Sequence, residues 1–224
     1  MMTTGMTWTG RLLATATLAV VGLAVPATAG AATGRSATGT ATTTPLVTTA
    51  TPVNYSCYVT YPGGSTNVPF ALTFTSTAPE RVGAYRPFSV TLDPQQWTPD
   101  PTFNQDVRNV TVKYRLPANA WYLWHQLSGG LNLGSTPPQV KVDSVARTLT
   151  LTVAGPLLAS VPFDLPTVTV YLLSGPSGVA QTATGGTSLT DPSWSWVRTD
   201  LEGVQRPFDC NPAAPVVFSS TTVG

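Results

Sequence analysis

The sequence predicts an all-β protein, an Ig-like or Greek-key β-sandwich. Three observations predict this class. Short segments alternate between apolar and polar residues, as strands with one buried face do. The chain's 21 prolines and 19 glycines separate these segments. No long stretch shows the apolar spacing i, i+3, i+4, i+7 of an amphipathic helix. Short strands separated by turns favour a sandwich of packed antiparallel sheets.

The first 29 residues predict a secretory signal peptide. Arg11 supplies a positive charge, residues 12–25 form an uncharged apolar run, and Ala27-Thr28-Ala29 offers small residues for cleavage. The apolar run is shorter than the about 20 residues that a membrane-spanning helix needs. We therefore expect export, with no stable membrane insertion after cleavage.

Residues 30–53 are rich in Thr and Ala and nearly free of charge, so we expect a disordered linker there. No lipid-attachment cysteine follows the leader, because the first cysteine is Cys57. The last residues form neither an apolar segment nor a sorting signal. The expected location is extracellular, with the protein either released or held non-covalently at the cell wall.

The β-sandwich domain is expected over residues 55–219. Its strands share the alternating pattern. In residues 68–77, for example, Phe70, Leu72 and Phe74 lie on one face and threonines on the other. In chain order, the expected strands cover residues 55–61, 68–77, 87–92, 107–116, 139–142, 148–153, 167–173, 194–197, 204–210 and 215–219.

Between these strands we expect loops, and the domain count depends on one of them. Residues 93–104 are proline-rich, and residues 174–191 are rich in Gly, Ser and Thr and expected to be exposed. Residues 120–127 (AWYLWHQL) fit a strand or a short helix equally. One large sandwich is the favoured organisation. The alternative is two smaller Ig-like units that meet near residues 117–138.

Cys57 and Cys210 are the only cysteines, and they bracket almost the whole domain. In an exported protein they are expected to form a disulfide, with two free buried thiols as the alternative. The bridge would close a loop of about 150 residues, which corresponds to about 5 kcal/mol in the chain-entropy model. We expect it to pin the first strand to the C-terminal segment, with Cα atoms about 4.4–6.8 Å apart.

The composition argues against several functions. Only 9% of residues are charged and the net charge is +1, whereas nucleic acids and anionic membrane surfaces call for basic patches. His125 is the only histidine, no G-x-S-x-G motif is present, and both cysteines are expected to be oxidised. The sequence therefore predicts no catalytic residue, no metal site and no cofactor.

Tryptophan and tyrosine give the sequence its candidate ligand-binding residues. Trp121, Tyr122 and Trp124 are clustered, Trp194 and Trp196 fall on one face of a strand, and Trp97 lies in the proline-rich loop. Exposed aromatic rings on a β-sandwich stack on sugars or anchor partners. The alternative is that they fill the core, although the loop position favours exposure of Trp97.

Several segments carry a family resemblance: YSCYV, TSTAPERVGAYRPFSV, LPTVTVYLLSGPSGVAQTATGG and FDCNP. With the Ala/Thr-rich leader, they resemble a family of secreted actinobacterial β-sandwich proteins with an early and a late cysteine. The resemblance covers most of residues 55–212. It implies secretion and β-rich halves between the cysteines, and it carries over no activity and no catalytic residue.

These observations favour a secreted, non-enzymatic β-sandwich module with a structural or binding role at or outside the cell envelope. Its expected partner is an unknown protein or glycan. One alternative is a carbohydrate-binding module that uses surface aromatics. Another is a secreted hydrolase with an unrecognised carboxylate site, and two aspartates in one cleft would be the structural evidence for it.

Overall fold

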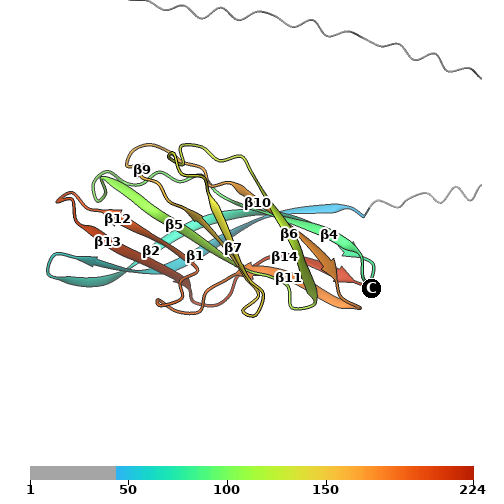
Figure 1. The fold of residues 1–224 in the computed structure, drawn as a ribbon. Coiled ribbons are helices and arrows are strands. Elements are labelled where there is room, and N and C mark those ends of the chain that lie inside the picture. The colour runs from blue at the N-terminus through green and yellow to red at the C-terminus, as the bar shows by residue number, and fades with distance from the viewer. Residues whose placement is uncertain (1–43) are drawn as a thin grey trace, which may run out of the picture. The chain divides into compact units, whose positions relative to one another are not determined.

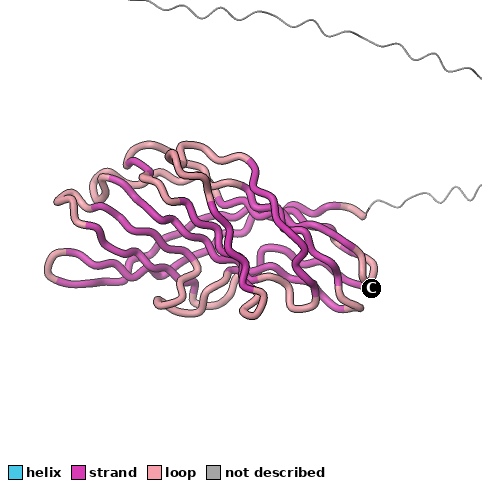
Figure 2. The backbone as a smooth tube through the Cα atoms, in the orientation of Figure 1, coloured by secondary structure: helices cyan, strands magenta, loops and turns pink. Residues whose placement is uncertain are grey.

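The computed structural model describes residues 44–224, which are built from fourteen strands (Figures 1 and 2). The predicted signal peptide, residues 1–29, and linker residues 30–43 lie outside the described residues. Within residues 44–224 no helix is long and apolar enough to cross a membrane. The structure confirms the predicted all-β class.

Every strand expected from the alternating pattern is present, and residues 120–127 lie in a strand. The bounds are β1 (Leu46–Tyr61), β2 (Gly64–Pro79), β3 (Arg81–Val82), β4 (Pro87–Pro94), β5 (Asp106–Arg115), β6 (Ala120–Ser128), β7 (Gln139–Asp143), β8 (Thr148–Val153), β9 (Leu157–Leu158), β10 (Thr167–Ser174), β11 (Gly178–Thr184), β12 (Trp194–Thr199), β13 (Gln205–Pro212) and β14 (Val217–Val223).

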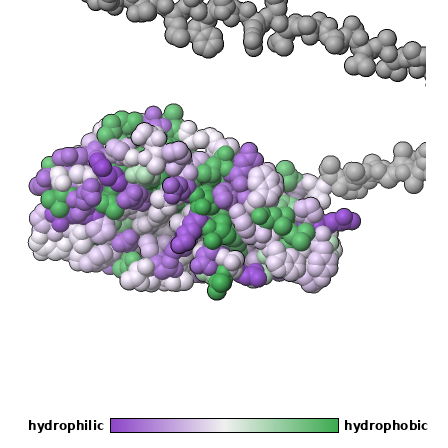
Figure 3. Space-filling model, in the orientation of Figure 1, coloured by the Kyte–Doolittle hydropathy of each residue, from purple (hydrophilic) through white to green (hydrophobic). Residues whose placement is uncertain are grey.

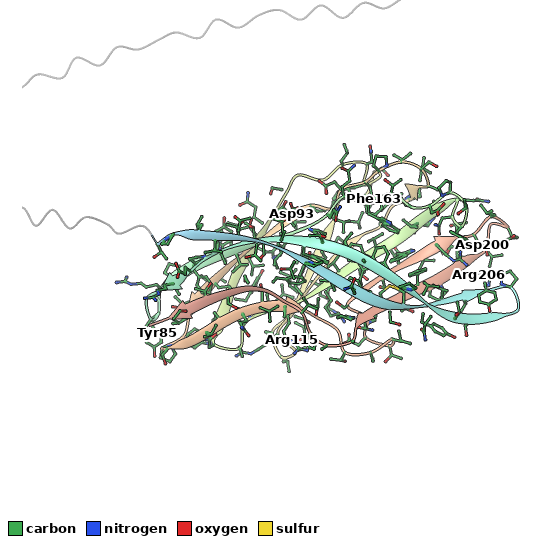
Figure 4. All side chains as sticks on the ribbon, turned by 180° about the vertical axis from the view of Figure 1, so that it is seen from behind. Tyr85, Asp93, Arg115, Phe163, Asp200 and Arg206 are labelled. Atoms are coloured by element: carbon green, nitrogen blue, oxygen red, sulfur yellow. A yellow bond between two sulfur atoms is a disulfide. The ribbon has the colours of Figure 1, made fainter. Side chains whose placement is uncertain are left out.

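The strands form one continuous hydrogen-bonded sheet in the order β3-β14-β11-β5-β12-β13-β1-β2-β4-β10-β6. Strand β8 joins the sheet at β5, and β7 pairs with β8. The sheet encloses a single core, because Val90 of β4 and Val170 of β10 belong to the same buried cluster as Val110 of β5 and Leu151 of β8. The arrangement is therefore a sandwich, and the long β1–β2 hairpin spans the face seen in Figure 4.

Strand β1 starts earlier than the sequence predicts. Residues 46–53 were expected to belong to the disordered linker, but they pair with residues 72–79 of β2. Val53 is completely buried. The Thr/Ala-rich composition hides the strand, because these residues show no alternation by themselves and β2 supplies the partner for their backbone groups. The prediction of a linker is wrong for this stretch.

Strand β11 was also missed, since residues 174–191 were expected to form an exposed loop. Ala180, Thr182 and Thr184 are buried, and the Thr182 hydroxyl lies 2.6 Å from the Ser219 hydroxyl of β14. Small and hydroxylated side chains can fill a core position when a partner satisfies them. Their low hydrophobicity conceals the strand in the sequence.

The described residues, 44–224, form one compact unit. Early and late strands interleave, since β1 pairs with β13 and β5 lies between β11 and β12. In the described part of the chain, no boundary falls near residues 117–138.

The disulfide between Cys57 and Cys210 is present. The two residues are direct partners in the β1–β13 ladder and both are buried. Their Cα atoms lie 4.0 Å apart, slightly closer than the expected range. As predicted, the bridge fastens the first strand to the C-terminal segment.

Candidate functional site

A groove of about 550 Å³ opens where the β1–β2 and β12–β13 hairpins meet the proline-rich loop of residues 93–104. Figure 1 shows these two hairpins and this loop reaching toward the same end of the sandwich. Six of its thirteen lining residues are aromatic, and we call it the aromatic groove. It consists of Val59, Tyr61, Val68, Pro69, Phe70, Trp97, Thr98, Asp100, Phe103, Asn104, Trp196, Arg198 and Phe208.

The inner rings of the groove form one packed cluster. Trp196 and Phe208 are cross-strand partners in β12 and β13, and their rings stack with centroids 4.0 Å apart. Trp97 lies 4.9 Å from Trp196 and 5.5 Å from Phe70 between ring centroids. Cross-strand aromatic pairs stabilise the sheet that carries them. The floor of the groove is therefore held rigidly by the fold.

The rim of the groove is exposed but anchored. The Phe103 side chain is 60% exposed, and Tyr61 at the end of β1 is also exposed. The Arg198 guanidinium donates to the Phe103 carbonyl at 3.1 Å and to the Thr60 carbonyl at 3.0 Å. Because one side chain ties the loop to the β1–β2 hairpin, it fixes the backbone that presents both exposed rings.

Polar groups stand among these rings. The Asp100 carboxylate accepts hydrogen bonds from the Thr102 hydroxyl at 2.7 Å and from the Thr102 backbone N–H at 2.8 Å. Both bonds lower the pKa of Asp100, the one from the Thr102 hydroxyl more strongly, so the Asp100 side chain is anionic at neutral pH. The Asn104 amide donates to the Asp100 carbonyl at 2.8 Å. The groove thus combines ring faces with a carboxylate, an amide and a guanidinium.

A second aromatic surface lies on β6, away from the groove. Trp121 and Trp124 are each 50% exposed. Trp124 stacks on Tyr171 of β10 with centroids 3.8 Å apart, and Trp121 lies beside Tyr85, 6.3 Å between centroids. Figure 4 places Tyr85 at the end of the sandwich opposite the β12–β13 turn, where the groove opens. We call this surface the β6 face.

The structure separates the six candidate residues. Trp121 and Trp124 lie on the β6 face. Tyr122 is partly buried, and its hydroxyl shares a hydrogen bond of 2.6 Å with His125 Nδ1. Trp194 is 1% exposed, so it cannot stack on a ligand.

Positions 194 and 196 fill the core, which was the alternative to a surface platform that the sequence left open. Both rings are on one face of β12 as expected, but that face points inward, and Trp194 packs against Phe70 and Phe74. Trp196 is buried too, yet it forms part of the groove floor. The periodicity gives the shared face, whereas only the sheet packing decides which side of the sheet is buried.

Trp97 is partly buried rather than exposed. Its backbone exchanges hydrogen bonds with Phe163 at 3.1 and 2.9 Å, and its ring lies 5.3 Å from that of Phe163. The proline-rich loop is therefore held against the sandwich, and Trp97 belongs to the groove.

The sequence did not single out Tyr61, Phe70, Phe103, Phe208 or Arg198. Phe103 lies in the same proline-rich loop as Trp97, and this position in the loop was the feature of the sequence that could have identified it. The other four come from two hairpins that are far apart in the chain, β1–β2 and β12–β13, and only the pairing of β1 with β13 brings the hairpins together.

Among residues 44–224, no group of three or more His, Cys, Asp or Glu side chains is placed to hold a metal ion.

Comparisons with known proteins support the fold. No family model matches the sequence, and no curated protein does so either. A similar solved structure is the crystal structure of a protein from Corynebacterium diphtheriae that is described as membrane anchored. The sequences are 14% identical, the TM-score is 0.50, and the match covers 80% of this chain and 38% of the other. This chain therefore spans well under half the length of that protein, and the likeness concerns the fold.

Proposed function

We propose that this protein is a secreted, non-enzymatic β-sandwich module that binds a ligand at the outer side of the cell envelope through the aromatic groove. The groove is the observation that carries the proposal. It has the size of a small-ligand site, six of its thirteen lining residues are aromatic, and a few fixed polar groups stand among them.

The proposed location rests on the predicted signal peptide and on the disulfide, a bond typical of exported proteins. The structurally similar Corynebacterium diphtheriae protein is described as membrane anchored, which fits a role at the envelope.

The ligand class that the groove favours is a saccharide, which makes the carbohydrate-binding alternative the sharper form of this proposal. Sugar rings present an apolar C–H face that stacks on aromatic rings such as Tyr61 and Phe103. Their hydroxyls both donate and accept hydrogen bonds. Asp100 supplies an acceptor and Asn104 an amide at the same groove.

The test is a binding assay with cell-wall and plant polysaccharides, first as pull-down on insoluble polymers and then as titration with soluble oligosaccharides. Trp97 and Trp196 lie in the groove, so a bound sugar is expected to change the tryptophan fluorescence. The same incubations, assayed for newly released reducing ends, test the hydrolase alternative, for which we expect no release.

Two groups of variants locate the site. F103A and Y61A remove the exposed rim rings, and each is expected to weaken binding about two- to tenfold, since an aromatic contact contributes about 0.5–1.5 kcal/mol. Y85A is the matched control, because Tyr85 is as exposed as Phe103, 60% in each case, but lies at the opposite end.

W121A and W124A test the β6 face as the platform instead. If these variants lose glycan binding while F103A and Y61A keep it, the groove is not the site. If no glycan binds to the wild-type protein, the saccharide proposal is overturned.

A further inference from the structure

Two arginines line a second hollow, which we call the arginine hollow. It has a volume of about 470 Å³ and lies beside the β7–β8 turn, at the lower edge of the sandwich in Figure 1. Arg115 is the last residue of β5, and Arg147 is the residue that precedes β8. The Leu116 backbone N–H donates to the Arg147 carbonyl at 2.8 Å. The fold therefore holds the two arginines at neighbouring positions of paired strands, and Figure 4 shows Arg115 at this edge.

The hollow carries positive charge with no carboxylate in its lining. Its ten lining residues include both arginines and no Asp or Glu. The ion pairs within residues 44–224 use Arg108, Lys113 and Arg206, so neither arginine of the hollow is engaged in one there. Asp143 precedes the same turn, but its carboxylate accepts hydrogen bonds from two backbone N–H groups of the turn, at 2.9 and 2.8 Å.

One of the two guanidiniums is held in place by the protein. Arg147 Nη1 donates to the Pro117 carbonyl at 2.9 Å and also to the Ala118 carbonyl. The Nε and Nη2 donors of Arg147 make no hydrogen bond to the described residues, and the exposed Arg115 side chain makes none either. A planar guanidinium presents paired donors that match the oxygens of a carboxylate or a phosphate.

The remainder of the hollow is apolar. Seven of its ten lining residues are Leu, Ala, Val or Pro, and none is aromatic. Val179 of β11 is 54% exposed and Val217 of β14 is 42% exposed. Figure 3 shows hydrophobic residues in a band over β6 and β7 that reaches this lower edge, with hydrophilic residues on both sides. Without a ring to stack on a sugar face, the hollow favours a ligand with an aliphatic body.

We propose that the arginine hollow binds an organic anion, with its carboxylate or phosphate held by Arg115 and Arg147 and its aliphatic body against Val179 and Val217. Charge-assisted hydrogen bonds from the two guanidiniums neutralise the head group. Burial of the aliphatic body adds apolar contact. The hollow and the aromatic groove share no lining residue, so this site does not depend on the function proposed for the groove.

The experiment is calorimetric titration of the exported chain with octyl phosphate, octanoate and octanol, each below the concentration at which it forms micelles. The anions are expected to bind about tenfold or more tightly than octanol, because octanol has the aliphatic body without the charge. The tighter of the two anions identifies the head group. Inorganic phosphate and acetate are expected to bind about tenfold or more weakly than their octyl counterparts, since they lack the aliphatic body.

A pair of variants tests the position of the site. R115Q is expected to weaken binding of the anions about tenfold, and it should fold normally because Arg115 is exposed. R108Q is the matched control, since it makes the same change of charge in the same strand. Arg108 lies seven residues from Arg115, about 23 Å along β5, and R108Q is expected to bind as the wild type does.

Nuclear magnetic resonance of the arginine Nε–Hε groups gives a measurement that needs no variant. Octyl phosphate is expected to shift the signals of Arg115 and Arg147 and to leave that of Arg108 in place. Octanol that binds as tightly as the anions would overturn the proposal, because the charge would then contribute nothing. Equal weakening by R115Q and R108Q would overturn it too, as would loss of anion binding in F103A with R115Q unaffected, which would place the anion in the aromatic groove.

Discussion

The strongest stability prediction concerns the Cys57–Cys210 disulfide. The perturbation is the double variant C57A/C210A, in which both thiols are removed so that no free cysteine remains. The two positions are fully buried and directly opposite in the β1–β13 ladder. Because the flanking ladder pairs hold the two strands together, the folded sandwich is expected to persist without the bridge, and the loss should fall mainly on the unfolded state.

The magnitude follows from the chain length between the cysteines. Their separation is 153 residues, so the bridge removes the loop-closure entropy of almost the entire described chain from the unfolded ensemble. The chain-entropy relation gives about 5 kcal/mol at 25 °C for this loop. Measured disulfides commonly contribute about 2–4 kcal/mol, so we expect a loss of about 3–5 kcal/mol. For a chain of this size, that loss corresponds to a fall in Tm of about 6–20 °C.

Urea unfolding of both proteins at equilibrium is the assay, followed by fluorescence and circular dichroism. The variant should show a lower midpoint and a larger m value, since the uncrosslinked unfolded chain exposes more surface. Wild-type protein unfolded in the presence of reductant is the control, and its midpoint should approach that of the variant. A loss below about 1 kcal/mol with an unchanged m value would refute the reasoning, because the bridge would then leave the unfolded ensemble unaffected.

Three further predictions test the burial and the ionisation of single residues. W194A should destabilise the fold by about 3–5 kcal/mol because it removes a fully buried ring, whereas W121A should cost less than about 1 kcal/mol, as measured by thermal unfolding. The Arg206 guanidinium lies 2.6 Å from the Asp200 carboxylate and lowers the pKa of Asp200 in the folded protein. The ion pair therefore stabilises the fold above the ordinary pKa of 3.8, and this stabilisation is lost as the pH falls through the lowered pKa of the folded state. D200N should flatten this acid limb when the urea midpoint is plotted against pH. Burial raises the pKa of Tyr114 well above 10.0, so stability should fall as the pH rises above 10.0, and the tyrosinate absorbance of Tyr114 should appear only with alkaline unfolding.

Much of the fold follows from local patterns in the sequence. Alternation in segments such as 68–77 and 148–153 gives both the strand and its buried face, because side chains in a strand alternate between faces. The two strands of the β7–β8 hairpin were predicted for the same reason. Local pattern fails where the buried side chains are small or hydroxylated, as in β11, or where the strand is Thr/Ala-rich, as in residues 46–53 of β1.

The site was harder to predict than the fold. Trp97 and Trp196 were singled out from sequence, but as candidates for exposed platforms, and the structure places both in the floor of one groove. Tyr61 and Phe208 lie 147 positions apart in the chain (208 − 61), so no local window contains both. The groove arises from the register of β1, β2, β12 and β13, and register depends on contacts distant in sequence.

The sequence by itself determined the all-β class, the positions of most strands and the pairing of Cys57 with Cys210, because alternation, turn residues and a cysteine count of two are local or compositional properties. Only the tertiary structure decided that Trp194 is buried, that Trp121 is exposed and that Arg115 and Arg147 line one hollow. The physical reason is that a strand's own residues fix which side chains share a face. The packing of the second layer then fixes which face is buried, and the strand order fixes which distant residues become neighbours.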